Sequence, residues 1–248
     1  QYYCKYSPEG YDLLNQEVFL RFPEDEYIDF DDSRIFTKSK RMKQIVQDIM
    51  QSHASGIHFR EWNAGPALDS VMKDEGFQLD IEVDWRTGFI HGGNKWNCGT
   101  WMDKMGESDL AGNRGVPTTP RDGAAIEITA LLKSSLDWLT SLKNFGFSGV
   151  KTRDDRFVQY SEWSELIQES FEAEYYMEEG GYYRDAIESS DPLACEQMRP
   201  NYLIAMAISP GIFDVNHARL ALASAEKNLT GPLGMKTLSS NDPAYRPN

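Results

Sequence analysis

The stretch DGAAIEITALLKSSLDWLTSLKNFG, from Asp122 to Gly146, carries the clearest fold signal in the sequence. Apolar residues recur in it at intervals of three and four, which is the period of one helix face. Asp122, after Pro120, is a suitable N-cap, and Gly146 is suited to ending a helix. The spacing therefore predicts a helix over 122–145 whose buried stripe is Ile128, Leu131, Leu132, Leu136, Leu139 and Leu142.

Weaker patterns on both sides extend this picture. Residues 39–51 and 200–208 also have helical patterns, and Asp214 is placed to cap a further helix. Over 77–90 the period changes to two around a turn, which is typical of a β-hairpin. The patterns predict an all-α fold with one inserted hairpin and long loops.

The composition is that of a globular chain with an acidic surface. The 248 residues are 40% hydrophobic, and 39 acids against 25 bases give a net charge of −14. Nucleic-acid binding needs clustered Lys and Arg, and the run KSKRMK at 38–43 is better explained as a solvated helix start. The acidic balance argues against an anionic membrane partner, and no apolar run approaches the roughly 20 residues that span a bilayer. We expect a neutral or cationic ligand.

The three cysteines, Cys4, Cys98 and Cys195, are widely spaced. Such a sparse, odd set indicates free thiols in a reducing compartment, so we expect a cytoplasmic protein. Cys98 shares a loop with His91, but two possible ligands without a third or fourth make a weak case for a metal. No motif sets a base beside Cys98 either, so nothing supports a catalytic cysteine. We expect neither a metal nor a cofactor.

A polar and aromatic loop, GGNKWNCGTWMDKMGES at 92–108, follows the predicted hairpin. Trp96 and Trp101 offer flat apolar faces, while Asn94 and Lys104 offer hydrogen bonds. This mixture suits a sugar, whose C–H face stacks on rings and whose hydroxyls need fixed polar partners. The loop is therefore a candidate carbohydrate site.

The carboxyl in this loop, Asp103, is a candidate general acid. A carboxyl held against tryptophan tends towards a raised pKa, which a general acid needs near neutrality. The alternative is that Asp103 only caps a helical turn. Taken alone, Glu127 is expected to be an exposed residue that complements a helix dipole, and Arg199 and Asn201 belong to a helix start. The residues by themselves leave these alternatives open.

Five motifs in order resemble one known family, the glucosidase region at the C-terminal end of the eukaryotic glycogen debranching enzymes. The resemblance runs from about Gly56 to the end and is looser before it. Its TWMD, PRDG and RPN motifs also resemble more distant microbial debranching and glucoamylase-like proteins. The five motifs are FREWNAGPALDSVMKDEGF, GGNKWNCGTWMDKMGESD, GVPTTPRDGAAIEITALL, MRPNYLIAMAISP and LTGPLGMKTLSSNDPAY.

The resemblance implies a fold and a reaction. The fold would be an (α/α)6 toroid, incomplete here, with residues 1–248 forming part of a single amylo-1,6-glucosidase domain. The reaction would be hydrolysis, with inversion, of the single α-1,6-linked glucose at branch stubs of glycogen or a branched limit dextrin. The partners would include the remaining domains of a longer polypeptide, one of which carries 4-α-glucanotransferase activity.

The resemblance also assigns site residues. Asp103, in TWMD, matches the general acid that protonates the glycosidic oxygen. The residues expected to bind substrate, from the family's motifs and from the loop's own composition, are Trp101, Lys104, Arg121, Glu127, Arg199, Asn201, Trp96 and Asn94.

The sequence departs from the family at one point. An inverting glycosidase needs a second carboxylate as base, and the family carries it in a segment resembling YHQGPEW, which these 248 residues do not contain. The chain also begins without methionine. We therefore expect a piece excised from a longer protein, holding the acid but not the base, and inactive alone. The alternative is a non-catalytic glucan-binding or scaffolding fragment.

Overall fold

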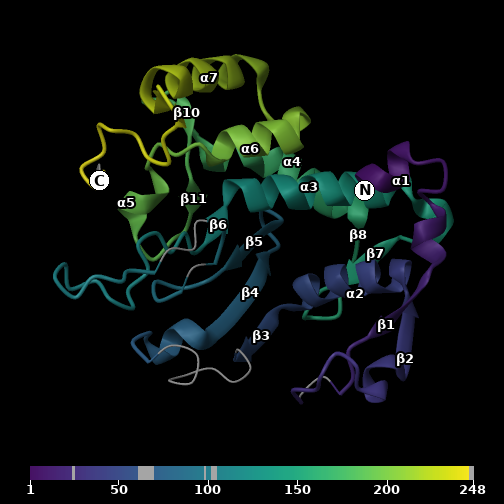
Figure 1. Cartoon of the computed structure of the whole chain (residues 1–248). Helices are drawn as coiled ribbons and strands as arrows, with labels where there is room; N and C mark the ends of the chain where they lie inside the picture. Colours follow the sequence, from purple (N-terminus) through teal and green to yellow (C-terminus); the bar gives the residue numbers. More distant parts are fainter. Residues whose placement is uncertain (24–25, 61–69, 98, 102–104, 246–248) are drawn as a thin grey trace.

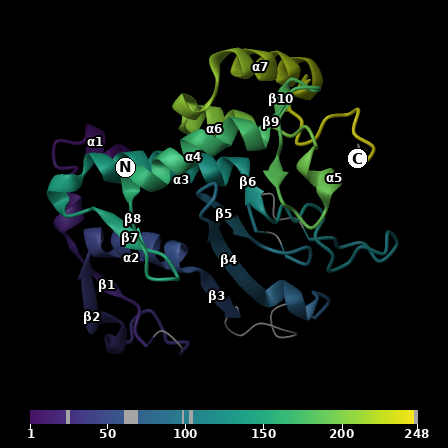
Figure 2. The ribbon, with the colours of Figure 1, turned by 180° about the vertical axis from the view of Figure 1, so that it is seen from behind.

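The computed structural model places one long helix at the centre of the molecule. Helix α3 (Ile126–Ser141) packs against α4 (Tyr160–Tyr175) and α6 (Asn201–Ile208). In both Figure 1 and Figure 2, α7 (Val215–Leu229) lies at one end, and α2 (Met42–Ser55) lies with strands β1 to β4 at the other. The structure describes residues 1–23, 26–60, 70–97, 99–101 and 105–245.

Short strands connect these helices and form six small antiparallel sheets in the described ranges. The largest has three strands in the order β3–β4–β5, and the other five have two each. The strands are β1 Glu17–Leu20, β2 Lys38–Arg41, β3 Ile57–Arg60, β4 Gln78–Asp84, β5 Phe89–Gly92, β6 Ala124–Ala125, β7 Gly149–Lys151, β8 Phe157–Gln159, β9 Tyr176–Met177, β10 Tyr182–Tyr183, β11 Ala186–Ile187, β12 Thr230–Gly231 and β13 Gly234–Met235.

The remaining helices are short. None of the helices in the described part of the chain combines the length and the apolar character that crossing a bilayer requires. The short helices are α1 Tyr2–Tyr6 and α5 Pro192–Cys195, with single 3-10 turns at Asp12–Asn15, Ser33–Phe36, Asp74–Phe77, Lys143–Phe145 and Pro210–Ile212.

The prediction of an all-α (α/α)6 toroid is wrong. Helices take up 42% of the described residues and strands 19%, so the fold is mixed. The physical reason lies in strand length: apart from β4, which has seven residues, each strand has four or fewer. Strands this short have no detectable alternation in the sequence, because a period of two needs about four to eight residues to show.

The central helix forms as expected but begins later, and four of the six residues of the predicted stripe are buried, namely Leu132, Leu136, Leu139 and Leu142. Asp122 does not cap it, because Ala124 and Ala125 pair with strand β11 and the helix starts at Ile126. Ile126 is consequently fully buried, whereas Leu131 of the predicted stripe is 46% exposed. Contact with both α4 and α6 buries a broad face, which a single stripe does not describe.

Three other predictions are confirmed. The hairpin exists as β4 and β5, with β3 added on its outer side. Pro200 precedes α6 directly. Asp214 caps α7, since its Oδ1 accepts hydrogen bonds from the backbone N–H of Asn216 at 2.8 Å and of His217 at 3.1 Å.

Candidate active site

The loop that follows the hairpin is closed at its base by two backbone hydrogen bonds. Gly92 N donates to Gly123 O at 3.1 Å, and Gly123 N donates to Gly92 O at 2.9 Å. Further along, two segments of the loop are joined where Gly106 N donates to Val116 O at 2.9 Å. Its described part extends away from the helices, between β5 and β6 (Figure 1). The long excursion is therefore anchored on the three-stranded sheet and on the segment before α3.

The first turn of the loop is built by two asparagines. Asn97 Oδ1 accepts from Asn94 N at 2.9 Å, and Asn94 Oδ1 accepts from Trp96 N at 2.8 Å. The amide nitrogen of Asn94 donates to Glu75 O at 2.9 Å, and that of Asn97 donates to Gln78 O at 3.2 Å. The two side chains thus hold the loop to β4 and to the 3-10 turn that precedes it. A sugar contact by Asn94 stays a prediction.

The two tryptophans of the loop have different environments. Trp96 is half-buried, and the ammonium groups of Lys95 and Lys73 lie 4.9 Å and 5.9 Å from its ring centroid. Trp101 is 53% exposed, so its ring is accessible to a ligand. The predicted acid Asp103 and its neighbour Lys104 lie outside the described residues.

Arg121 links this loop to the helical core. Its Nη1 donates to Thr100 Oγ1 at 2.9 Å, directly before the exposed Trp101. Its Nη1 and Nη2 both donate to the Glu127 carboxylate on α3, the second at 2.6 Å to Oε2. Arg121 and Glu127 are each only 3% exposed. Such a two-pronged contact fixes the plane of the guanidinium as well as its position.

Asp185, just before β11, is the hub of the same cluster. Arg121 Nε donates to its Oδ2 at 2.6 Å, and Asn201 Nδ2 donates to its Oδ1 at 2.6 Å. Arg199 Nε lies 3.9 Å from the same carboxylate and also donates to Gln197 Oε1 at 3.1 Å. The cluster therefore joins the segment before α3, the strand before α5 and the start of α6 around one buried carboxylate.

The backbone between the loop and the helix is in an unusual conformation. Arg121 has a φ of 50° and Gly123 one of 87°, both in the left-handed region. Asp122, between them, accepts hydrogen bonds from Ser189 Oγ at 2.8 Å and from Ser190 N at 2.9 Å. A non-glycine residue at positive φ is strained and persists only when its surroundings hold it. Here the ion pairs of Arg121 provide that hold.

The cluster is balanced in charge: Arg121 and Arg199 face Glu127 and Asp185. Burial opposes the charge on Arg121, but hydrogen bonds and attraction from Glu127 and Asp185 outweigh it and raise the pKa of the guanidinium. Burial also lowers the pKa of Arg199 and raises that of Asp185, the latter against the pull of Arg121. The ion pairs stay formed because each buried charge has an opposite partner.

A cavity of about 220 Å³ adjoins the cluster. Arg121 and Thr100 form its polar side, with His53 from the end of α2, and Ile81 and Ile128 belong to its apolar wall. The glycines at the base of the loop complete it. Within the described ranges, no group of three or more His, Cys, Asp or Glu side chains is arranged to hold a metal ion.

The model of the family described as amylo-alpha-1,6-glucosidase matches residues 1–248. The chain belongs to the amylo-alpha-1,6-glucosidase family. It is also 47% identical, over 269 aligned positions, to a protein of Saccharomyces cerevisiae named "Glycogen debranching enzyme". That alignment covers 100% of this chain and 18% of the yeast protein, so the chain spans under a fifth of its relative's length.

Four of the predicted site residues lie together in the structure of this amylo-alpha-1,6-glucosidase family member. Arg121 and Asn201 contact Asp185 directly, Glu127 pairs with Arg121, and Arg199 lies at the edge. The sequence-only expectation that Glu127 is exposed is wrong, because α3 buries this face under Arg121. Their roles in binding substrate remain predictions.

Asp185 was missed by the sequence analysis. It follows Arg184 in an unremarkable polar stretch, and no spacing marks it. Its position depends on the pairing of β11 with β6, two strands of two residues each. A buried carboxylate that accepts from an arginine and an asparagine is recognisable only once this pairing is known.

Proposed function

We propose that this chain is part of an enzyme that hydrolyses the single α-1,6-linked glucose left at a branch point of glycogen. The match of the amylo-alpha-1,6-glucosidase family to residues 1–248 carries the proposal. The 47% identity to the yeast protein named glycogen debranching enzyme supports it. The substrate would be glycogen or a branched limit dextrin.

In the proposed reaction Asp103 is the general acid. It donates its proton to the glycosidic oxygen as the bond to the leaving chain breaks, while a water attacks the opposite face of the sugar. A second carboxylate, about 6.5–9.5 Å from the acid, removes a proton from that water. By the family resemblance this base belongs to a segment that residues 1–248 do not include. The result is free glucose with inverted configuration.

The buried cluster gives the proposed acid loop a rigid support. The side chain of Thr100 is tied to Arg121, and Arg121 is held by Glu127 and Asp185, so the first residue of the TWMD motif is connected to α3 and to the segment before β11. Catalytic groups lose activity when their support permits displacements of about 1 Å. The exposed ring of Trp101 is available to stack on the sugar.

The wider setting follows from the same proposal. Residues 1–248 would form part of a single glucosidase domain within a longer polypeptide, whose other parts include the 4-α-glucanotransferase region of the family. We place the protein in the cytoplasm. Cys4 and Cys195 are buried free thiols, which is typical of a reducing compartment.

The test is glucose release from an α-1,6-glucosylated maltooligosaccharide by the full-length polypeptide. Asp103→Asn should lower kcat by about 10²- to 10⁴-fold, the usual contribution of a general acid, while binding persists. Asp109→Asn is the matched control, because Asp109 belongs to the same loop and its side chain is 80% exposed. The control should keep wild-type rates.

A glucan-binding role without catalysis is the second candidate, favoured by the exposed Trp101 beside a polar loop. It predicts that Asp103→Asn releases glucose as fast as wild type. That outcome would show that Asp103 is not the general acid and that its loop only binds sugar. Loss of hydrolysis with retained binding would exclude the second candidate.

A further inference from the structure

A groove along strand β4 has no part in the site described above. It consists of two adjoining hollows of about 280 Å³ and 360 Å³, which share Ser55, Gly56, Glu82 and Arg153. We call this combined surface the outer groove. Its continuity makes it longer than a single rounded pocket.

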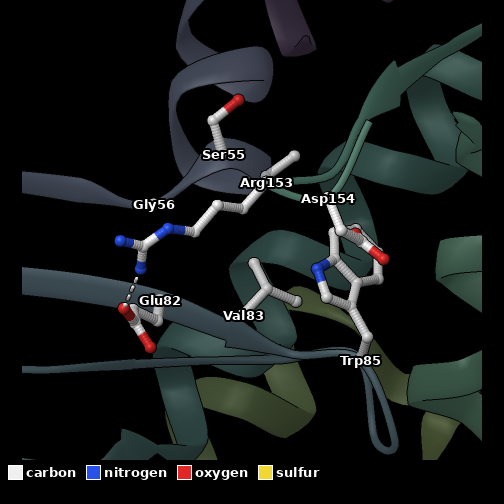
Figure 3. A pocket seen from close by; sticks show the side chains of 8 residues that line it. Ser55, Gly56, Glu82, Val83, Trp85, Arg153 and Asp154 are labelled. Atoms are coloured by element: carbon white, nitrogen blue, oxygen red, sulfur yellow. Dashed lines mark hydrogen bonds and ion pairs between the residues drawn. The ribbon is translucent and has the colours of Figure 1, made fainter. Parts of the chain in front are cut away.

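The outer groove offers both donors and acceptors around an apolar patch. Figure 3 shows Arg153 along one side, its guanidinium paired with Glu82, and Val83 opposite. The nitrogen-bearing edge of the Trp85 indole faces the same space, with the Asp154 carboxylate beside the ring. The Arg153–Glu82 pair is 3.1 Å long, and its side chains are 81% and 69% exposed. Both charged groups can therefore reorient towards a ligand.

The charges exclude most ligand classes. An anion would meet the carboxylates of Asp80, Glu82 and Asp154. A simple cation would have to displace Arg153 from Glu82 and His58 from Asp80. An organic cation would need a free aromatic face, but the Arg156 guanidinium lies 5.6 Å from the Trp85 ring centroid and the Trp163 ring centroid lies at 4.9 Å. A neutral polyhydroxylated ligand suits the groove, because each sugar hydroxyl both donates and accepts.

We propose that the outer groove binds an α-glucan chain separate from the branch being hydrolysed. This inference rests on the proposed function for its choice of sugar. Arg153 and the indole N–H donate to hydroxyls, Glu82 and Asp154 accept from them, and the Val83 methyl groups contact the C–H face of a ring.

The position of the groove explains what such binding would accomplish. The cavity beside Arg121 and the outer groove share no lining residue: Ile81 of β4 lines the cavity, and Glu82 lines the groove. The end of α2 is divided in the same way, with His53 at the cavity and Ser55 at the groove. The cavity and the groove are separate hollows, and a branched particle presents many chains. Holding a second chain raises the effective concentration of branch points at the site.

The first readout is amide hydrogen exchange of the full-length polypeptide with and without maltoheptaose. Saturating maltoheptaose should slow exchange at residues 55–58 and 150–156. Arg153→Ala and Trp85→Phe should raise the maltoheptaose concentration for half-protection by about three- to tenfold, the loss of one hydrogen bond of moderate strength. Arg219→Ala, an exposed arginine on α7, should leave it unchanged.

The second readout is kinetic. Arg153→Ala should raise KM for a limit dextrin about threefold or more without changing kcat, and should leave the kinetics on a short branched oligosaccharide unchanged. Absence of protection at residues 55–58 and 150–156 in the wild type would overturn the proposed groove site, as would equal protection in Arg153→Ala. These exchange results do not depend on catalysis. Failure of the groove proposal can therefore be distinguished from failure of the proposed function, which Asp103→Asn tests.

Discussion

Two arginines of this chain each face carboxylates, but one is buried and the other is exposed to solvent. Arg121 meets Glu127 and Asp185 with side chains between 1% and 3% exposed. Arg153 meets Glu82 with side chains 81% and 69% exposed. The first pair lies at the junction of the loop over residues 92–108 and the core, and the second lies on the rim of the outer groove.

The difference teaches that burial, not residue type, decides what an ion pair does. A buried pair is worth little against an apolar replacement, but removing one partner leaves a stranded charge. It therefore fixes one geometry. An exposed pair contributes about 0–1 kcal/mol and opens easily. It is therefore free to exchange its partner for a ligand hydroxyl.

The strongest test of this contrast is the removal of each arginine. Arg121→Ala leaves Glu127 and Asp185 buried without a cation between them, so we expect a loss of about 3–5 kcal/mol in the free energy of unfolding. Arg153→Ala should stay within about 0.5 kcal/mol of wild type. Urea unfolding of the purified variants measures both. Equal losses would show that exposure is a poor guide here.

The acidic partners allow a gentler version of the same test. Asp185→Asn keeps the shape but points amide hydrogens towards the N–H groups of Arg121, so we expect a loss of about 2–3 kcal/mol. Glu82→Gln, its exposed counterpart, should be near zero. The urea midpoints of the two variants give the comparison, and a neutral Asp185→Asn would contradict the role of Asp185 as hub.

The backbone beside Arg121 gives a third test. Gly123→Ala and Gly146→Ala both place a side chain at positive φ, 87° and 91°, which costs about 1–2 kcal/mol. An added Cβ at Gly123 would also lie 2.2 Å from Ile187 O, whereas nothing lies within 4 Å at Gly146. We expect Gly123→Ala to be the less stable variant by about 1–2 kcal/mol more. Similar urea midpoints would mean that β6 and β11 can move apart at little cost in free energy.

The smallest effect concerns an ion pair of intermediate exposure, between His217 on α7 and Glu172. His217 Nδ1 lies 2.8 Å from Glu172 Oε2, and that hydrogen bond raises the pKa of His217 above its usual value of about 6.5. The pair therefore stabilises fully below about pH 6.5, and its contribution disappears as the pH rises through the raised pKa.

Because His217 is 31% exposed, the predicted effect is modest. The Tm difference between wild type and His217→Gln should be larger at pH 5.5 than at pH 9 by about 1–2 °C. A difference that is the same at both pH values would show that stacking on Tyr176, 3.7 Å between ring centroids, is the main contribution.

The sequence predicted the parts of the fold whose signals are local. The hairpin, the start of α6 and the Asp214 cap all depend on residues within a few positions of one another. The all-α class failed because strands such as β6 and β11 have two residues each and exist only through their partners. The same pairing moved the start of the central helix from Asp122 to Ile126.

The candidate site divides in the same way. Motif resemblance selected Arg121, Glu127 and Asn201, and the structure brings them together. It could not select Asp185, because a hub carboxylate has no motif of its own and is defined by three elements distant in the sequence. The burial of Glu127 also escaped prediction, since a helix pattern does not show which neighbour covers its first turn.

The pair of hydrogen bonds between Gly92 and Gly123 has an evolutionary consequence. It makes residues 93–122 an excursion whose two ends meet on the same framework. The entropic cost of closing such an excursion grows only by about 0.6 kcal/mol for each doubling of its length. Insertions away from the TWMD motif therefore cost little stability, while the framework beneath the excursion stays the same.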